Sequence, residues 1–182
     1  SNTLSSNTGG VGNTALGSSA MLFNTTGARN IGIGRYALRN NTTGGSNVAL
    51  GSYALQANVG STNNVAVGNY ALRCNTASNN TAVGINALYT NITGANNVAV
   101  GRCNLFANTV DNTTAVGALA LWCNTSGTGN SAFGTSALRN NTTGNNNTAV
   151  GYNTLFNNTF AVRNVAIGNN ALCANTSSSN NT

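Results

Sequence analysis

The sequence predicts an all-β fold, a single β-solenoid (β-roll) of about eleven 17-residue coils with in-register Asn, Leu and Ala columns. Three observations predict it. A motif recurs at a nearly fixed period along all 182 residues. Apolar residues do not follow the i, i+3, i+4, i+7 pattern of an amphipathic helix. The composition is dominated by Asn (38), Thr (25) and Gly (22), which are poor helix formers.

The repeat ends in Asn-x-Ala-(Val/Ile/Leu)-Gly, and we number each coil from this Gly as position 0. Successive glycines are 17 residues apart in seven intervals and 16 apart in two. We expect residues 1–182 to form one continuous array in this register, without a linker, separate domains or capping segments. The ten glycines are Gly17, Gly34, Gly51, Gly68, Gly84, Gly101, Gly117, Gly134, Gly151 and Gly168.

Each repeat is too short for two packed helices and a turn, so it is predicted to form one coil with two short strands and two bends. One strand would precede the Gly, the other would lie around Ala-Leu, and a polar Asn-Thr-Thr-Gly turn would follow. Coils then stack in register at the strand spacing of about 4.8 Å. The Gly at position 0 is expected to have a positive φ or to permit close backbone approach.

Two columns are predicted to form the core ladder. The +7 Asn can bond the amides above and below it, or alternatively the backbone of its own turn. The +4 Leu and the −1 aliphatic residues are expected to be buried. The predicted ladder residues are Asn24, Asn41, Asn58, Asn75, Asn91, Asn108, Asn124, Asn141, Asn158 and Asn175, with Leu38, Leu55, Leu72, Leu88, Leu105, Leu121, Leu138, Leu155 and Leu172.

Position −2 is almost always Ala, on the opposite strand face from the largely apolar positions −3 and −1. A half-exposed strand would alternate apolar and polar residues. Two interpretations remain open. Either the coil is so thin that only Ala fits inside it, or the Ala face packs closely on another chain.

The composition argues against an enzyme. Asp111 is the only carboxylate, and there is no His or Lys to act as an acid, a base or an activator of a nucleophile. We expect no catalytic site, cofactor or metal site. No apolar run is long enough for membrane insertion. The net charge of +6 comes from seven Arg spread along the chain, which favours solubility over nucleic-acid binding.

The segments around Gly51, Gly68 and Gly168 (Asn-Val-Ala-Leu-Gly, Asn-Val-Ala-Val-Gly and Asn-Val-Ala-Ile-Gly) resemble the head repeats of YadA-type trimeric autotransporter adhesins. The longer unit Asn-Thr-Ala-Val-Gly-x-x-Ala-Leu-x-x-Asn-Thr-Thr-Gly resembles repeats of phage and virus tail-fibre proteins and of bacterial surface proteins. The resemblance covers essentially the whole chain. It implies a left-handed β-roll that is extracellular, on a cell or virion surface, and that presents a binding surface or forms a stalk. The sequence departs from the adhesin heads in its period, which is shorter there, and these 182 residues show no pattern of that family's coiled-coil stalk or membrane anchor.

Variable positions +1, +2, +5 and +6 are interpreted as outward or corner positions. Their aromatic residues form a possible contact stripe, which would serve self-association, stacking within the chain or a foreign ligand. The cysteines Cys74, Cys103, Cys123 and Cys173 are too far apart or on different corners for pairing within the chain, which leaves bridges between chains open. The stripe comprises Tyr36, Tyr53, Tyr70, Tyr89, Phe106, Trp122 and Phe156.

The sequence favours a structural, extracellular, fibre-forming solenoid whose partner is itself, as a homopolymer or homo-oligomer. Coils that continue in the repeat register at both ends would be templates for head-to-tail assembly, and lateral assembly is also possible. The alternative is an adhesin or tail-fibre segment that binds a host receptor or a surface glycan. Ice binding is a third hypothesis, which the adjacent Thr columns at +8 and +9 disfavour because neighbours point in opposite directions.

Overall fold

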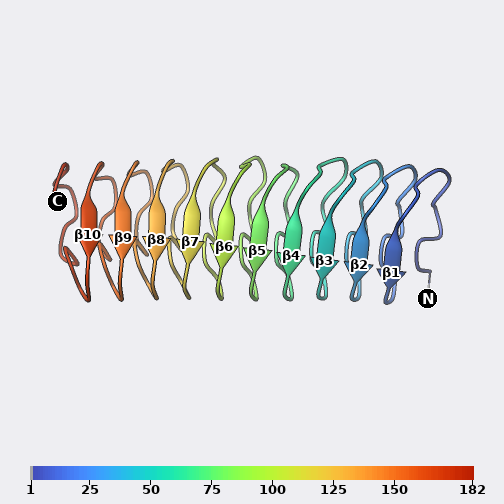
Figure 1. Ribbon diagram of the computed structural model, residues 1–182, viewed down its shortest axis with the longest axis horizontal. Coiled ribbons are helices and arrows are strands. Elements are labelled where there is room, and N and C mark those ends of the chain that lie inside the picture. Colours follow the sequence, from blue (N-terminus) through green and yellow to red (C-terminus); the bar gives the residue numbers. More distant parts are fainter. Residues whose placement is uncertain (1) are drawn as a thin grey trace.

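The computed structural model describes residues 2–182 and confirms the predicted β-solenoid. Ten parallel strands form one sheet in sequential order, β1 to β10, so that the chain winds once around the rod between neighbouring strands. The N- and C-terminal ends lie at opposite ends of the rod (Figure 1). The strands are β1 Thr14–Leu16, β2 Ile31–Ile33, β3 Val48–Leu50, β4 Val65–Val67, β5 Thr81–Val83, β6 Val98–Val100, β7 Thr114–Val116, β8 Ser131–Phe133, β9 Thr148–Val150 and β10 Val165–Ile167.

Identical repeat positions pair across the whole sheet. Val48 lies opposite Val65, seventeen residues on, and Val65 lies opposite Thr81, sixteen residues on. The two shorter coils therefore keep the strand register. The missing residue is removed from the turn between positions +7 and −4, which leaves the strands unchanged.

The prediction of a second strand in each coil is wrong. Positions +1 to +6 form consecutive turns in which the residues at +2 and +4 have a positive φ, such as 60° at Tyr53 and 50° at Leu55. Alternating left-handed residues prevent an extended backbone. These turns form the second wall of each coil, which we call the turn wall. Its backbone still forms hydrogen bonds from coil to coil, for example from the Leu38 amide to the Ala54 carbonyl at 3.0 Å.

The prediction that the −1 column is buried is also wrong. The strand directs the small −2 residue inward and the −3 and −1 side chains outward. Ala49 is fully buried, whereas Val100 is 36% exposed and Ile167 is 72% exposed. Because the two walls of the coil lie so close together, only Ala fits inside at position −2, or Gly in the one coil that has Gly32 there. The thin-coil interpretation of the Ala column is therefore correct.

The core consists of the −2 and +3 Ala columns and the +4 Leu column, which form one continuous cluster. Leu38 to Leu155 in the +4 column have no exposed surface. Leu172 departs from the prediction, because it is 38% exposed. It lies in the last coil of the described chain, so a neighbouring coil covers it on one side only.

The Gly at position 0 meets both expectations. Its φ is 124–137° in the ten coils, a region that is strained for any other residue. A Cβ at Gly84 would also lie 2.3 Å from the carbonyl oxygen of Gly101 in the next coil. The sharp corner after each strand thus requires Gly for two independent reasons.

Candidate functional site

The +7 Asn side chains form a hydrogen-bonded ladder inside the rod. Asn141 donates from Nδ2 to Oδ1 of Asn124 at 2.9 Å and to the carbonyl of Gly144 at 3.0 Å. Its own Oδ1 accepts from Asn158 at 2.9 Å. The two interpretations of this column are therefore both correct, since one amide bonds its neighbour and its own turn. Nine of the predicted ladder Asn residues are buried, and Asn175 in the last coil is half-buried.

The ladder is interrupted in the two 16-residue coils. In their shortened turns, Asn75 and Asn108 donate to a carbonyl two residues on, and not three. Neither donates to the Asn of the preceding coil. As a result, Oδ1 of Asn91 is buried without a hydrogen-bond partner, and Oδ1 of Asn58 accepts from the hydroxyl of Ser61 instead.

A second Asn ladder, at position −4, was missed. Asn47 bonds Oδ1 of Asn30 through its backbone N–H at 2.9 Å and through its side chain at 3.1 Å. Its Nδ2 also donates to the carbonyl of Ser61 in the next coil at 2.9 Å. The near-constant Asn at −4 was a signal as clear as that at +7. The buried members are Asn30, Asn47, Asn64, Asn80, Asn97, Asn130, Asn147 and Asn164.

The outward side chains of the ten strands form an uncharged face, which we call the sheet face. It consists of positions −3 and −1 of every coil, and none of these side chains is buried. Position −1 is apolar throughout, and position −3 is aliphatic, Thr or Ser. The exposed members include Leu16, Ile31, Ile33, Val98, Val100, Phe133, Val150, Val165 and Ile167.

The predicted contact stripe is brought together on the turn wall. Its first six rings form one continuous series from coil to coil, with centroids 5.1 Å to 6.4 Å apart. The guanidinium of Arg139 lies 5.4 Å from the ring centre of Trp122 and 5.5 Å from that of Phe156, which links the seventh ring to the series. Phe23, which the prediction omitted, joins the other end through Arg39, at 5.0 Å.

Four of the seven arginines stack on this stripe: Arg35, Arg39, Arg73 and Arg139. Arg35 lowers the pKa of the Tyr36 phenol, through a hydrogen bond and through its charge. The same hydrogen bond raises the pKa of Arg35. The contact stripe and these four arginines together form what we call the aromatic wall. Most of the positive charge of the chain thus lies on the aromatic wall, and the sheet face carries none.

The stripe changes column at its centre. Its rings occupy position +2 at Tyr36, Tyr53 and Tyr70, and position +5 from Tyr89 onward. At this change the centroids of Tyr70 and Tyr89 are 6.4 Å apart with planes inclined by 54°. Asn86 takes the +2 place beside Tyr70, and its small side chain leaves a shallow hollow of about 490 Å³.

Other chemistry is sparse in the described residues. The four cysteines are half-buried free thiols, and burial raises the pKa of Cys123. Residues 2–182 contain no group of three or more His, Cys, Asp or Glu side chains that could hold a metal ion. Nor does that range contain a helix suited to crossing a bilayer.

The geometry defines the class of the molecule: a repeat protein of the β-solenoid type with internal Asn ladders, an uncharged sheet face and an aromatic–arginine wall. Comparison with known proteins adds no narrower assignment. No family model, curated protein or solved structure matches the chain significantly.

Proposed function

We propose that this protein is a structural, fibre-forming solenoid that acts outside the cell, and that its rods associate laterally through the sheet face. The observation that carries the proposal is the uncovered outer face of a parallel sheet. All-parallel sheets normally have both faces covered. Here the turn wall covers one face, and the side chains of the other, such as Val100 and Phe133, remain in contact with solvent.

The occupant of this face is a second copy of the chain. Two faces of the same composition are complementary, because neither carries a charge that burial would leave unpaired. Ten strands at about 4.8 Å and three residues at about 3.3 Å give a face of roughly 50 Å by 10 Å. Two such faces bury about 1,000 Å² in total, which is the lower bound for a specific interface.

Stacking along the rod is supported by the uniformity of the contact between coils. Each 17-residue coil offers the same Asn amide to its neighbour, as Asn141 does to Asn124 and Asn158 to Asn141. A contact of this kind is self-complementary between coils with an intact ladder, so it suits axial assembly of copies. The resemblance of the repeat to those of surface and tail-fibre proteins supports an extracellular location.

The test uses a charge at the centre of the sheet face. Val83→Lys places an ammonium group on the outward side of β5, where the half-buried side chain of Val83 faces away from the core. The matched control is Ile85→Lys, because Ile85 is an aliphatic residue, 50% exposed, in the same coil but outside the sheet face. Sedimentation velocity over a wide concentration range measures association, and electron micrographs measure particle width and length.

We expect the unmodified protein and the Ile85→Lys variant to form particles wider than one rod, and the Val83→Lys variant to form narrow ones. A monomer of 18.3 kDa for the unmodified protein at all concentrations would refute the proposal. Equal association of the two Lys variants would refute the role of the sheet face.

A second candidate function, adhesion to a surface glycan, is favoured by the aromatic–arginine wall. Ice binding gains no support, because the +8 Thr hydroxyls are used within the rod. Thr25, for example, donates from Oγ1 to the carbonyl of Thr42 at 3.0 Å.

A further inference from the structure

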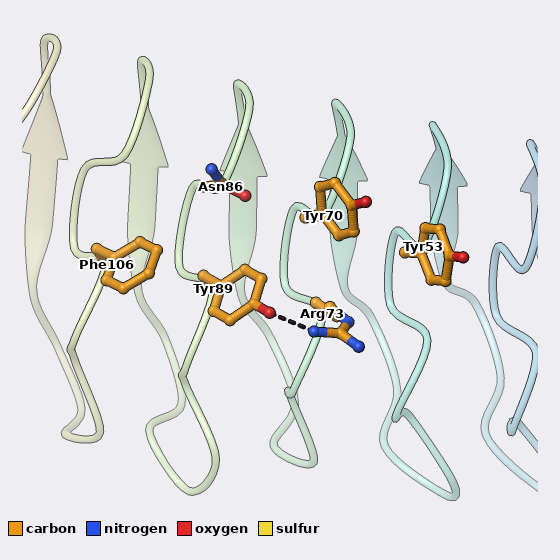
Figure 2. Close-up of a pocket in the computed structure, with 6 residues that line it drawn as sticks. All are labelled: Tyr53, Tyr70, Arg73, Asn86, Tyr89 and Phe106. Atoms are coloured by element: carbon orange, nitrogen blue, oxygen red, sulfur yellow. Dashed lines mark hydrogen bonds between the residues drawn. The ribbon is translucent and has the colours of Figure 1, made fainter.

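The aromatic wall has one place where a ring is missing. In the +2 column Tyr53 stacks on Tyr70 at 5.1 Å, and in the +5 column Tyr89 stacks on Phe106 at 5.1 Å. Between these pairs lies the hollow of about 490 Å³, lined by those four rings, Arg73 and Asn86. Figure 2 shows two staggered rows, with Tyr53, Tyr70 and Asn86 above and Arg73, Tyr89 and Phe106 below.

We propose that this hollow binds sugar rings of an acidic polysaccharide through stacking on Tyr70 and Tyr89 and an ion pair with Arg73. The site lies on the turn wall and is independent of the assembly proposed for the sheet face. The proposal names the ligand class for adhesion, which is the second candidate function, and it therefore rests on that function.

The ring faces suit a sugar. In Figure 2 the rings of Tyr53, Tyr70, Tyr89 and Phe106 lie in front of the backbone, and each presents one face obliquely to the viewer. An aromatic face carries negative charge density, and a pyranose ring has a face of slightly positive C–H groups that can lie flat on it. Tyr70 is 37% exposed, so its surface is available for such contact.

Polar groups around the rings can select hydroxyl and carboxylate groups. Arg73 is held in place, because Nε donates to Gln56 at 3.1 Å and Nη1 donates to the hydroxyl of Tyr89. A guanidinium has five N–H donors, so three remain for a ligand. The side-chain amide of Asn86 has one partner, the thiol of Cys103 at 3.9 Å, which is a weak contact.

The charge favours an acidic ligand. The protein has a net charge of +6, and the hollow contains one guanidinium and no carboxylate. The next guanidinium of the +5 column, Arg39, lies two coils away, or about 10 Å by the strand spacing. A polyuronate carries one carboxylate per sugar, so a sugar in the hollow can present one carboxylate to Arg73.

The decisive variant fills the hollow without disturbing the fold. Asn86→Tyr continues the +2 column, where Tyr36, Tyr53 and Tyr70 already have a φ of 60–61°, close to the 56° of Asn86. The matched control is Asn153→Tyr, which adds a ring at the same repeat position, with a φ of 50°, far from the hollow. Arg73→Gln removes the charge and keeps a hydrogen-bonding side chain, and Arg163→Gln is its control.

Isothermal titration with three probes tests the proposal: a β-1,4-linked mannuronate hexamer, neutral cellohexaose and a hexathymidylate. We expect the mannuronate hexamer to bind most tightly. Asn86→Tyr should weaken its binding at least about tenfold, with no change in Asn153→Tyr. Arg73→Gln should weaken its binding about tenfold while the affinity for cellohexaose stays unchanged. Circular dichroism confirms that each variant folds.

Several results would overturn the proposal. Absence of mannuronate binding at millimolar concentration would do so, as would unchanged binding by Asn86→Tyr. Equal affinity for cellohexaose and mannuronate would refute the acidic class of ligand. Tighter binding of hexathymidylate would assign the hollow to single-stranded nucleic acid instead.

Discussion

The +7 ladder makes a quantitative prediction, because the chain contains both intact and interrupted stretches of it. Asn141→Ala in an intact stretch removes three hydrogen bonds, to Asn124, to the carbonyl of Gly144 and from Asn158. The carbonyl of Gly144 retains a bond from Asn130 at 2.7 Å. Oδ1 of Asn124 retains none and is left buried. At about 1 kcal/mol per bond and about 1–3 kcal/mol for an unpaired buried group, the expected cost is about 4–6 kcal/mol.

Asn108→Ala is the matched control, because it lies in a 16-residue coil. It removes only two hydrogen bonds, to the carbonyl of Val110 and from Asn124. That carbonyl retains a bond from Asn97 at 2.7 Å, and Nδ2 of Asn124 retains one to Gly127 at 2.9 Å. No group is left without a partner, so the expected cost is about 2 kcal/mol. The lost side-chain volume is the same in both variants and cancels in the comparison.

The assay is denaturation in guanidinium followed by circular dichroism, with amide hydrogen exchange by mass spectrometry to localise the loss. We expect a lower midpoint for Asn141→Ala than for Asn108→Ala, and faster exchange confined to the coils next to residue 141. An equal or larger effect of Asn108→Ala would refute the reasoning that ladder continuity determines the stability of a coil. Unchanged stability of both variants would show that the buried amides contribute nothing.

Three further predictions concern the core, the corner and the aromatic wall. Leu72→Asn should cost about 2–5 kcal/mol in the free energy of unfolding, because it places an amide among the buried Ala and Leu side chains, and thermal denaturation would measure this. Gly84→Ala should prevent folding of its coil. Gly9→Ala should be tolerated, because a Cβ at Gly9 meets nothing closer than 3.7 Å. The recovery of soluble, folded protein would distinguish the two variants. Tyr36 should ionise at a lower pH than free tyrosine because Arg35 lowers its pKa, and Arg35→Gln should raise that pKa in an ultraviolet titration. The lowered pKa contributes stability only as the pH rises through it.

The repeat and its columns predicted the fold well. A nearly constant period of 17, with Leu at +4 and Asn at +7, favours stacked coils of the same shape, and the structure has them. Leu38 to Leu155 are buried for the reason expected, namely that each is covered by the coils before and after it.

The direction of the strand side chains could not be predicted from alternation alone. Period-two alternation shows that positions −3 and −1 share a face, but not which face points inward. The usual expectation places the larger apolar residue inside. Here the narrow interior accepts Ala49 and excludes Val48 and Leu50, so the expectation failed.

The hollow on the aromatic wall could not be predicted from the sequence either. Tyr70 and Tyr89 occupy different repeat positions, and their proximity depends on the left-handed residues of the turn wall. Those residues include Tyr70, at 61°, and Leu72, at 50°. Neither residue type normally adopts such a φ, so no local pattern indicates it.

The shortened turns have a genetic consequence. Two coils are one residue shorter between positions +7 and −4 while the strands on both sides keep their pairing. Loss of a single codon in this turn is therefore compatible with the fold. Loss of one in a strand would exchange the inner and outer side chains of every position that follows in that strand. Recombination between misaligned repeats adds or removes whole coils and preserves every contact between neighbours. Rod length is thus a trait that unequal crossover can change in steps of one coil, without a new fold having to evolve.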